Sequence, residues 1–223
     1  MAIVVGALLN AKNIKKYEIK SAKIEYAIKG SRNILGMVKT EISGKKKLIF
    51  DNYGCKRVEE ESKVSKEIAL GNTKIKKSHT LYYLNGHVIY NVDFNKKRII
   101  REENSVTSRD EVLLKKRGRK RIGSDTIMGY DCDIWNFSGE KQCIYKGIPL
   151  RIESTTMGLK RVEIATKVVF DISLDKKDFQ LPNYPVFNFD IDMMMAGEKP
   201  KKLDKSRLEK MDKRANEAKE VAW

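Results

Sequence analysis

The stretch YDCDIWNFSGEKQCIYKGIPLRIESTTMGLKRVEIATKVVFDISLDKKDFQLP, residues 130–182, decides the fold class of this chain. From position 162 to position 172 every second residue is apolar or threonine, and charged residues fill most of the positions between. A period of two predicts a β-strand with one buried and one solvated face. Just before it, Ile144, Ile148, Leu150 and Ile152 share one parity. Three successive antiparallel strands with one apolar face form a sheet that must be covered or must hold an apolar ligand.

The N-terminal half predicts a further antiparallel meander. Apolar and charged residues alternate in YEIKSAKIEYAIK (17–29), and ILGMVKTEIS (34–43) and KKKLIFD (45–51) are expected as the strands that follow. The expected turns between these strands are Gly30-Ser31, Ser43-Gly44 and residues 51–54. The more charged CKRVEEESKV (55–64) predicts an edge-like strand, and the polar residues 63–72 predict a loop or a short helix.

Helical segments are expected at three places. Residues 107–118 begin with the capping residues Thr107 and Ser108 and end at Gly118, which suits a helix terminus. Residues 173–179 form a short helical turn that Pro182 closes. In residues 201–223, leucine, methionine and alanine recur at helical spacing, but this apolar stripe is thin. We therefore expect this tail to be dispensable for folding.

The order GYDCDIW, QCIYKGIPLRIES, Gly158, IATKVVFDISLD and a final DFQLP resembles the periplasmic LolA-like family of lipoprotein carriers and outer-membrane lipoprotein-sorting domains. The resemblance covers roughly residues 15–185. It implies a mainly β fold with a few helices: a curved antiparallel half-barrel whose concave side is closed by short helices near 107–117 and 173–179. The hollow of the carriers holds acyl chains. The resemblance thus implies a non-enzymatic carrier of a lipid, an acyl chain or a lipoprotein in the periplasm of a Gram-negative bacterium.

Two sets of residues are the expected functional sites. The apolar residues of the alternating strands should line the cavity: Ile148, Leu150, Val162, Ile164, Val168 and Phe170. The run KKRGRKR (115–121) would lie at the rim of the cavity, where the resembled fold has a helix. Its basic side chains are expected to contact an anionic membrane surface, with a merely solvated helix end as the alternative: Lys115, Lys116, Arg117, Arg119, Lys120 and Arg121.

The chain divides into three expected parts. Residues 1–14 are a signal-peptide remnant and lead-in, residues 15–187 the half-barrel domain, and residues 188–223 a C-terminal extension with a basic helix. The apolar run from Ile3 to Leu9, followed by Asn10-Ala11, is typical of the end of a secretory signal peptide. A first β-strand or a helical turn is the alternative interpretation of this run.

Charge alone would also suit a nucleic-acid-binding protein. The chain has 46 basic and 30 acidic residues, a formal net charge of +16, which favours anionic partners. Binding of single-stranded nucleic acid needs aromatic side chains interleaved with basic ones on an exposed face. Here Tyr26, Tyr145 and Phe170 share parity with aliphatic neighbours. Nucleic-acid binding therefore ranks behind the other hypotheses, and no nucleic-acid partner is expected.

The three cysteines, Cys55, Cys132 and Cys143, leave at least one thiol free. Cys132 and Cys143 lie on adjacent predicted strands, so the strand register decides whether they can form a disulfide. Pairs whose residue numbers sum to 275 would place them opposite each other, a sum of 277 places them diagonally on one face, and a sum of 276 places them on opposite faces. The sequence has only two histidines and no CxxC spacing, so no metal or cofactor is expected.

No catalytic motif is evident in the sequence, which lacks GxSxG, P-loop and HExxH patterns. Asp131 and Asp133, and likewise Asp190 and Asp192, are two residues apart on predicted strands, where both members of a pair point to solvent. We therefore expect a protein that is not an enzyme. A protein-interaction or sensory module, with the same half-barrel but a cavity filled by its own side chains, is the alternative to a carrier.

Overall fold

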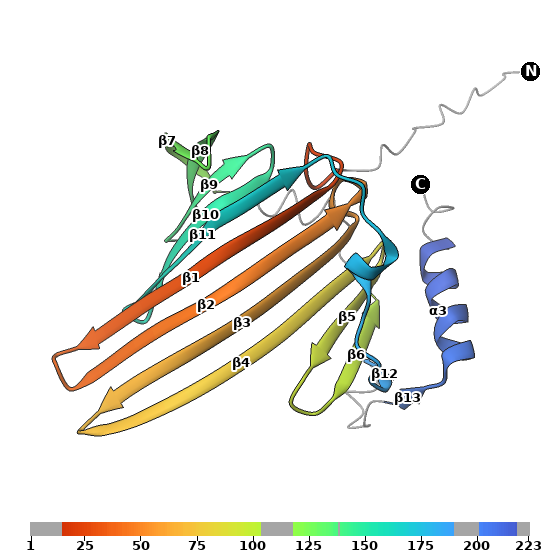
Figure 1. Cartoon of the computed structure of the whole chain (residues 1–223), viewed down its shortest axis with the longest axis horizontal. Coiled ribbons are helices and arrows are strands. Elements are labelled where there is room, and N and C mark those ends of the chain that lie inside the picture. Colours follow the sequence, from red (N-terminus) through yellow and green to blue (C-terminus); the bar gives the residue numbers. More distant parts are fainter. Residues whose placement is uncertain (1–14, 104–117, 138, 190–200, 218–223) are drawn as a thin grey trace, which may run out of the picture.

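One large β-sheet dominates the computed structural model, which describes residues 15–103, 118–137, 139–189 and 201–217. Its thirteen described strands curve strongly without closing into a barrel (Figure 1). Their order in the sheet is β13-β12-β6-β5-β4-β3-β2-β1-β11-β10-β9-β8-β7. The predicted fold class, a mainly β chain built on one curved antiparallel sheet, is confirmed.

Consecutive hairpins build both halves of the sheet. The first half contains β1 (Ala22–Ile34), β2 (Val38–Asp51), β3 (Lys56–Ala69), β4 (Asn72–Asn85), β5 (Val88–Asp93) and β6 (Arg98–Glu103). The second half contains β7 (Lys120–Ile127), β8 (Tyr130–Phe137), β9 (Glu140–Tyr145), β10 (Ile148–Thr156) and β11 (Leu159–Phe170). The two halves meet where β1 pairs with β11. The short β12 (Val186–Asn188) joins β6 in parallel, and β13 (Lys201–Leu203) pairs with β12.

The turns expected at Gly30-Ser31 and Ser43-Gly44 are wrong, because both glycines lie inside long strands. A Cβ at Gly44 would approach the Ser62 carbonyl oxygen to 2.5 Å, and one at Gly30 would lie 3.0 Å from the Lys160 carbonyl oxygen. These glycines therefore allow neighbouring strands to approach closely rather than reversing the chain.

Residues 63–72 also differ from the prediction of a loop or short helix. They complete β3, turn at Leu70-Gly71 and begin β4. Their polar composition hid the strands, because this end of the hairpin is largely solvated and lacks the alternation that a buried face imposes. Nor is β3 an edge strand, since it pairs with β2 and β4.

The two faces of the sheet carry separate apolar clusters. The face that we call the pocket face carries Ile24 and Tyr26 of β1 and Leu48 of β2. The opposite face, here called the helix face, carries Ile49 of β2 and Tyr83 of β4. Adjacent strand residues point to opposite faces, so Leu48 and Ile49 belong to different clusters.

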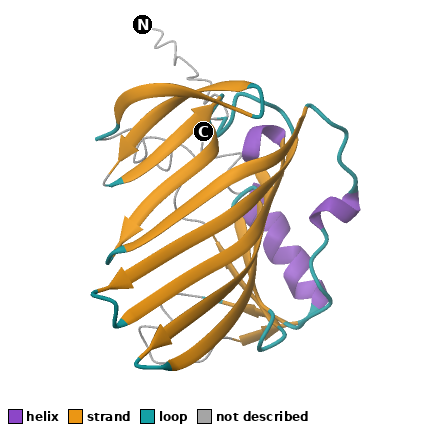
Figure 2. Cartoon of the chain, turned by 60° about the vertical axis from the view of Figure 1, so that its left-hand side comes forward, coloured by secondary structure: helices purple, strands orange, loops and turns teal. Residues whose placement is uncertain are grey.

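Two of the described helices pack on the helix face, whereas the short 3₁₀ helix η1 (Asn52–Gly54) joins β2 to β3. Phe179 of the 3₁₀ helix η2 (Lys176–Phe179) and Ala215 of helix α3 (Lys205–Glu217) are both buried in the cluster around Tyr83, and Figure 2 shows both helices on the same side of the sheet. The expectation that the 173–179 helix covers the cavity is therefore corrected: η2 lies on the face opposite the pocket. The helix expected at 107–117 falls outside the described residues.

The C-terminal segment is integrated into the domain. Leu203 of β13 is buried, and Asp212 of α3 accepts a hydrogen bond from Arg101 Nε at 2.7 Å and another from the Tyr90 hydroxyl. The Arg101 side chain is completely buried and also contacts Glu103 and Asn188. The thin apolar stripe of α3 is thus supplemented by the buried polar contacts of Arg101 and Asp212, which the sequence pattern does not reveal.

The register of the second half joins two cysteines. Asp133 pairs with Ile144, a sum of 277, which places Cys132 and Cys143 diagonally on one face. The structure links them in a disulfide, while Cys55 stays a free thiol. This bond crosslinks β8 and β9 next to the buried side chains Ile148 and Leu150.

Candidate functional site

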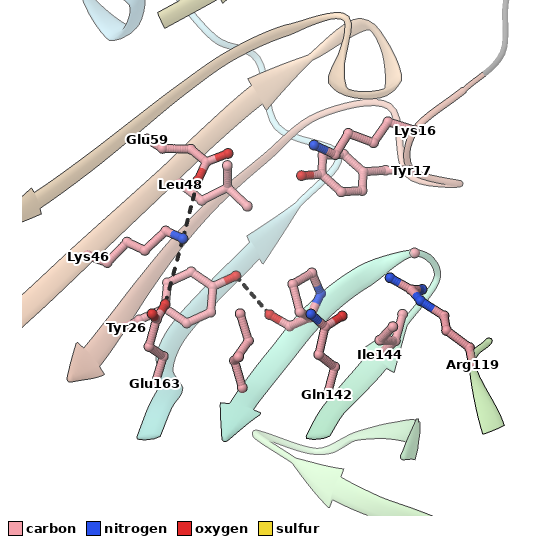
Figure 3. A pocket seen from close by; sticks show the side chains of 13 residues that line it. Lys16, Tyr17, Tyr26, Lys46, Leu48, Glu59, Arg119, Gln142, Ile144 and Glu163 are labelled. Atoms are coloured by element: carbon pink, nitrogen blue, oxygen red, sulfur yellow. Dashed lines mark hydrogen bonds and ion pairs between the residues drawn. The ribbon is translucent and has the colours of Figure 1, made fainter. Parts of the chain in front are cut away.

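A cavity of about 300 Å³ opens on the pocket face (Figure 3). The neighbouring strands β3, β2, β1, β11, β10 and β9 contribute to it, together with the segment that precedes β1. The side chains and backbone of the following residues line it: Lys16, Tyr17, Tyr26, Lys46, Leu48, Glu59, Arg119, Gln142, Ile144, Gly147, Pro149, Ile152 and Glu163. Because side chains from strands so far apart converge on one cavity, the sheet curves inward on this face.

One part of the lining is apolar. Tyr26 and Leu48 come from the central strands, and Ile144, Pro149 and Ile152 come from the β9–β10 hairpin. The Tyr26 hydroxyl donates to the Pro149 carbonyl oxygen at 3.1 Å, which links the central strands to this hairpin. Burial and the nearby Tyr17 raise the pKa of Tyr26 well above its ordinary value, so the hydroxyl stays protonated and keeps this donor.

A chain of ion pairs borders the apolar lining. Lys46 Nζ lies 3.2 Å from a Glu59 oxygen and 3.6 Å from a Glu163 oxygen (Figure 3). Arg161 extends the chain, because its guanidinium lies 2.8 Å from Glu163 and 2.7 Å from Glu61. The cavity is therefore amphipathic, with carboxylates and an ammonium group beside hydrocarbon.

The charges of this chain are mutually stabilised. Burial alone would lower the pKa of Lys46, but Glu59 and Glu163 outweigh it and raise that pKa above its ordinary value. Burial would likewise raise the pKa of Glu59, yet Lys46 and Arg57 hold it below the ordinary range. Both groups are thus charged at neutral pH.

The segment before β1 forms one wall of the cavity. The backbone N–H groups of Lys16 and Tyr17 both donate to the Tyr53 carbonyl at 3.1 Å, and Glu18 N–H donates to the Lys146 carbonyl at 3.1 Å. This segment thereby bridges the β2–β3 and β9–β10 turns. Gly54 leaves room for the ring of Tyr17, since a Cβ there would approach that ring to 2.8 Å.

The six predicted cavity residues do not line this cavity. Ile148 and Leu150 are completely buried in the cluster of the pocket face, and Val168, Phe170 and Ile164 pack against that cluster. Phe170 lies with its ring centroid 5.0 Å from that of Tyr130 and 5.7 Å from that of Tyr145. Val162 is 36% exposed.

The single face assumed for β11 is corrected by a β-bulge. Ile24 pairs with Val168 but Tyr26 pairs with Ala165, so β11 holds one extra residue opposite β1. Beyond an extra residue, odd and even positions of the strand exchange the faces to which they point. Val168 therefore lies on the same face as Ala165 and Glu163, although its position has the opposite parity. Val162 and Ile164 pair with residues of β1 on the opposite face, although Ile164, next to the bulge, still contacts the cluster of the pocket face.

The basic run divides between several environments. Lys115, Lys116 and Arg117 lie outside the described residues. Arg119 lines the cavity, and burial lowers the pKa of its guanidinium. Lys120 and Arg121 are exposed at the start of the edge strand β7, where Arg121 lies 2.7 Å from Asp133.

Sequence reasoning missed the charged residues of the cavity. Glu163 occupies a position that the uninterrupted alternation assigns to the solvated face, and only the bulge turns it inward. Lys46 lies in a run of three lysines that is typical of a solvated strand. The acidic series Glu59, Glu60 and Glu61 could have indicated these ion pairs, because an acidic strand beside a lysine-rich one favours cross-strand ion pairs.

The described part of the chain shows neither a metal-type cluster of side chains nor a helix that could span a membrane. Among these residues, histidine, cysteine, aspartate and glutamate do not gather in threes that could hold a metal ion. Within the same ranges, the structure contains no helix long and apolar enough to cross a bilayer. The predicted signal segment, residues 1–14, lies outside the described ranges.

No protein-family model and no curated protein sequence matches the chain. An uncharacterized conserved protein from Thermus thermophilus aligns with 79% of this chain and 95% of its own, at 7% identity and a TM-score of 0.45. A LolA superfamily protein from Nitrosomonas europaea aligns at 10% identity over 75% of this chain and 93% of its own, with a TM-score of 0.35. A putative outer-membrane lipoprotein-sorting protein domain from Vibrio parahaemolyticus aligns at 10% identity over 74% and 92%, with a TM-score of 0.29. The solved structures similar to this chain thus include members of the family that its sequence resembles.

Proposed function

We propose that this protein is a non-enzymatic binding protein that carries an acyl chain of a lipid or lipoprotein in the cavity of the pocket face. The observation that carries the proposal is the convergence of Tyr26, Leu48, Ile144 and Ile152 on one hollow of about 300 Å³. That volume is at the lower end of ligand pockets, which suits one slender chain rather than a bulky molecule.

The polar groups of the cavity suit an amphipathic ligand. Lys16 and Arg119 lie at its boundary, on the N-terminal segment and just before β7. A cation beside an apolar hollow favours a ligand with an anionic head group on a hydrocarbon tail. We further propose that the basic run from Lys115 to Arg121 contacts the anionic membrane that supplies or receives this ligand.

The disulfide supports a location in the periplasm. Bonds such as Cys132–Cys143 persist in oxidising compartments and are rare where thioredoxin and glutathione keep thiols reduced. A periplasmic carrier would meet both the acyl chains and the anionic membrane surfaces that the proposal requires.

The test is uptake of a fluorescent fatty acid by the full chain, with Ile144→Trp as the blocking variant. The indole would occupy the hollow, so we expect uptake to fall at least tenfold. Val162→Trp is the matched control, because Val162 is partly exposed and outside the cavity lining. We expect this control to bind as the unaltered protein does.

Two results would contradict the carrier proposal. One is the absence of uptake by the unaltered protein, and the other is equal uptake by both tryptophan variants. Failed uptake together with a protein partner captured through the pocket face would favour the interaction module. The ion pairs of Lys46 with Glu59 and Glu163, which line part of the cavity, are the observation that favours that alternative.

A further inference from the structure

Three hairpin tips carry highly exposed apolar residues at one end of the sheet. Leu35 lies in the β1–β2 turn, Leu70 in the β3–β4 turn and Met157 in the β10–β11 turn, with 87%, 85% and 88% of their surfaces exposed. These hairpins are neighbours, since β2 pairs with β3 and β1 pairs with β11. Val38 pairs with Ala69 and Ser31 with Lys160, which places all three tips at the same end, at the lower left of Figure 1. We call Leu35, Leu70 and Met157 the tip residues.

The backbone at the tips does not favour such side chains. Each tip residue has φ of 49° and is followed by a glycine that also has positive φ. Tight hairpin turns at these angles favour asparagine, aspartate or glycine, because a bulky side chain crowds the left-handed conformation. Leucine and methionine are therefore poor choices both for the turn and for exposure to water.

The surroundings of the tips are basic. Within four residues of the three turns the sequence has six basic side chains and three acidic ones. The basic ones are Arg32, Lys39, Lys66, Lys74, Lys160 and Arg161, and the acidic ones are Glu41, Glu67 and Glu153. Lys66, Lys74 and Lys160 are exposed. Both strands next to the Leu70 turn are also largely solvated, and Ile75 there is 61% exposed.

We propose that these three tips form a docking edge for an anionic lipid bilayer, with the tip residues entering the interface and the lysines contacting acidic head groups. Exposed apolar groups flanked by basic side chains bind such surfaces through combined burial and electrostatic attraction. The tip residues are not among those that line the cavity, so the proposal goes beyond the carriage of a ligand.

The experiment measures co-sedimentation of the full chain with vesicles of phosphatidylcholine and phosphatidylglycerol, without any fatty acid. The test variant is Leu35→Asn/Leu70→Asn/Met157→Asn, which keeps the net charge and places asparagine where the turns tolerate it. We expect at least a tenfold loss of vesicle binding, with an unfolding midpoint that is unchanged or higher. We also expect the unaltered protein to bind less in high salt and to bind pure phosphatidylcholine weakly.

Met128→Asn is the matched control. Met128 also has positive φ before a glycine and is 53% exposed, but successive hairpins place its turn at the other end of the strands. We expect this variant to bind vesicles like the unaltered protein. A triple variant that binds phosphatidylglycerol vesicles normally would overturn the docking edge, and so would an unaltered protein that does not bind them. The vesicle assay contains no fatty acid, so its result does not depend on whether the protein takes up acyl chains.

Discussion

The two faces of the sheet are closed in different ways. On the helix face, the chain covers its own apolar residues with η2 and α3, and Asp212 on α3 reaches the buried Arg101. On the pocket face, the N-terminal segment and the β9–β10 hairpin bend toward the central strands but leave a cavity. Both faces therefore hold a packed apolar cluster, but only the pocket face also leaves a cavity.

The buried polar contact should give the largest effect. Asp212→Ala removes the carboxylate next to a completely buried guanidinium, and we expect a loss of about 3 kcal/mol in the free energy of unfolding. Urea denaturation measures it, with Lys213→Ala on the exposed side of α3 as the control, expected within about 0.5 kcal/mol. A loss below about 1 kcal/mol would mean that the helix face is closed by apolar contacts alone.

Truncation of Phe170 tests the packed part of the pocket face. The ring contacts Tyr130 and Tyr145, so Phe170→Ala should lower the free energy of unfolding by about 2–3 kcal/mol. Val162→Ala, beyond the bulge, should lower it by less than about 1 kcal/mol. Thermal or urea unfolding of both variants measures the difference. Equal losses would show that the bulge does not separate the two residues energetically.

The ion pairs of the cavity should give the smallest effect. The pKa of Glu59 is lowered in the folded state, so its contribution is complete above the unfolded value of about 4.3 and is lost as the pH falls through the folded pKa. We expect the unaltered protein to lose up to about 1 kcal/mol more than Glu59→Gln between about pH 6 and about pH 3. Urea midpoints at both values measure this, with Glu209→Gln as an exposed control. Identical pH dependence of Glu59→Gln and the unaltered protein would show that the ion pairs of Glu59 do not contribute to the free energy of unfolding.

Much of the fold follows from local patterns. Period-two alternation and short turns predict the meander, and the geometry of neighbouring strands limits Cys132 and Cys143 to few registers. The short helix ending at Phe179 also follows from the sequence, although its face does not. These features depend on residues close together in the chain.

The rest depends on contacts that no local pattern encodes. One extra residue near Thr166 changes which side chains of β11 face the cavity. The predicted lining residues therefore lie partly in the packed core and partly on the opposite face. The docking of α3 depends on Arg101 and Asp212, which are far apart in sequence and resemble ordinary surface charges when taken separately. The glycines at 30 and 44 look like turns, because their close approach to neighbouring strands is visible only in three dimensions.

The pairing of β1 with β11 also determines the order in which the chain can fold. Residues 35–158 lie between these two strands, so during synthesis β1 can pair with β2 long before its other neighbour exists. Such non-local pairing slows folding, and an unpaired strand edge invites association with other chains. The centre of the finished sheet is therefore an unpaired edge in the growing chain, and this edge favours association with other chains until β11 has emerged.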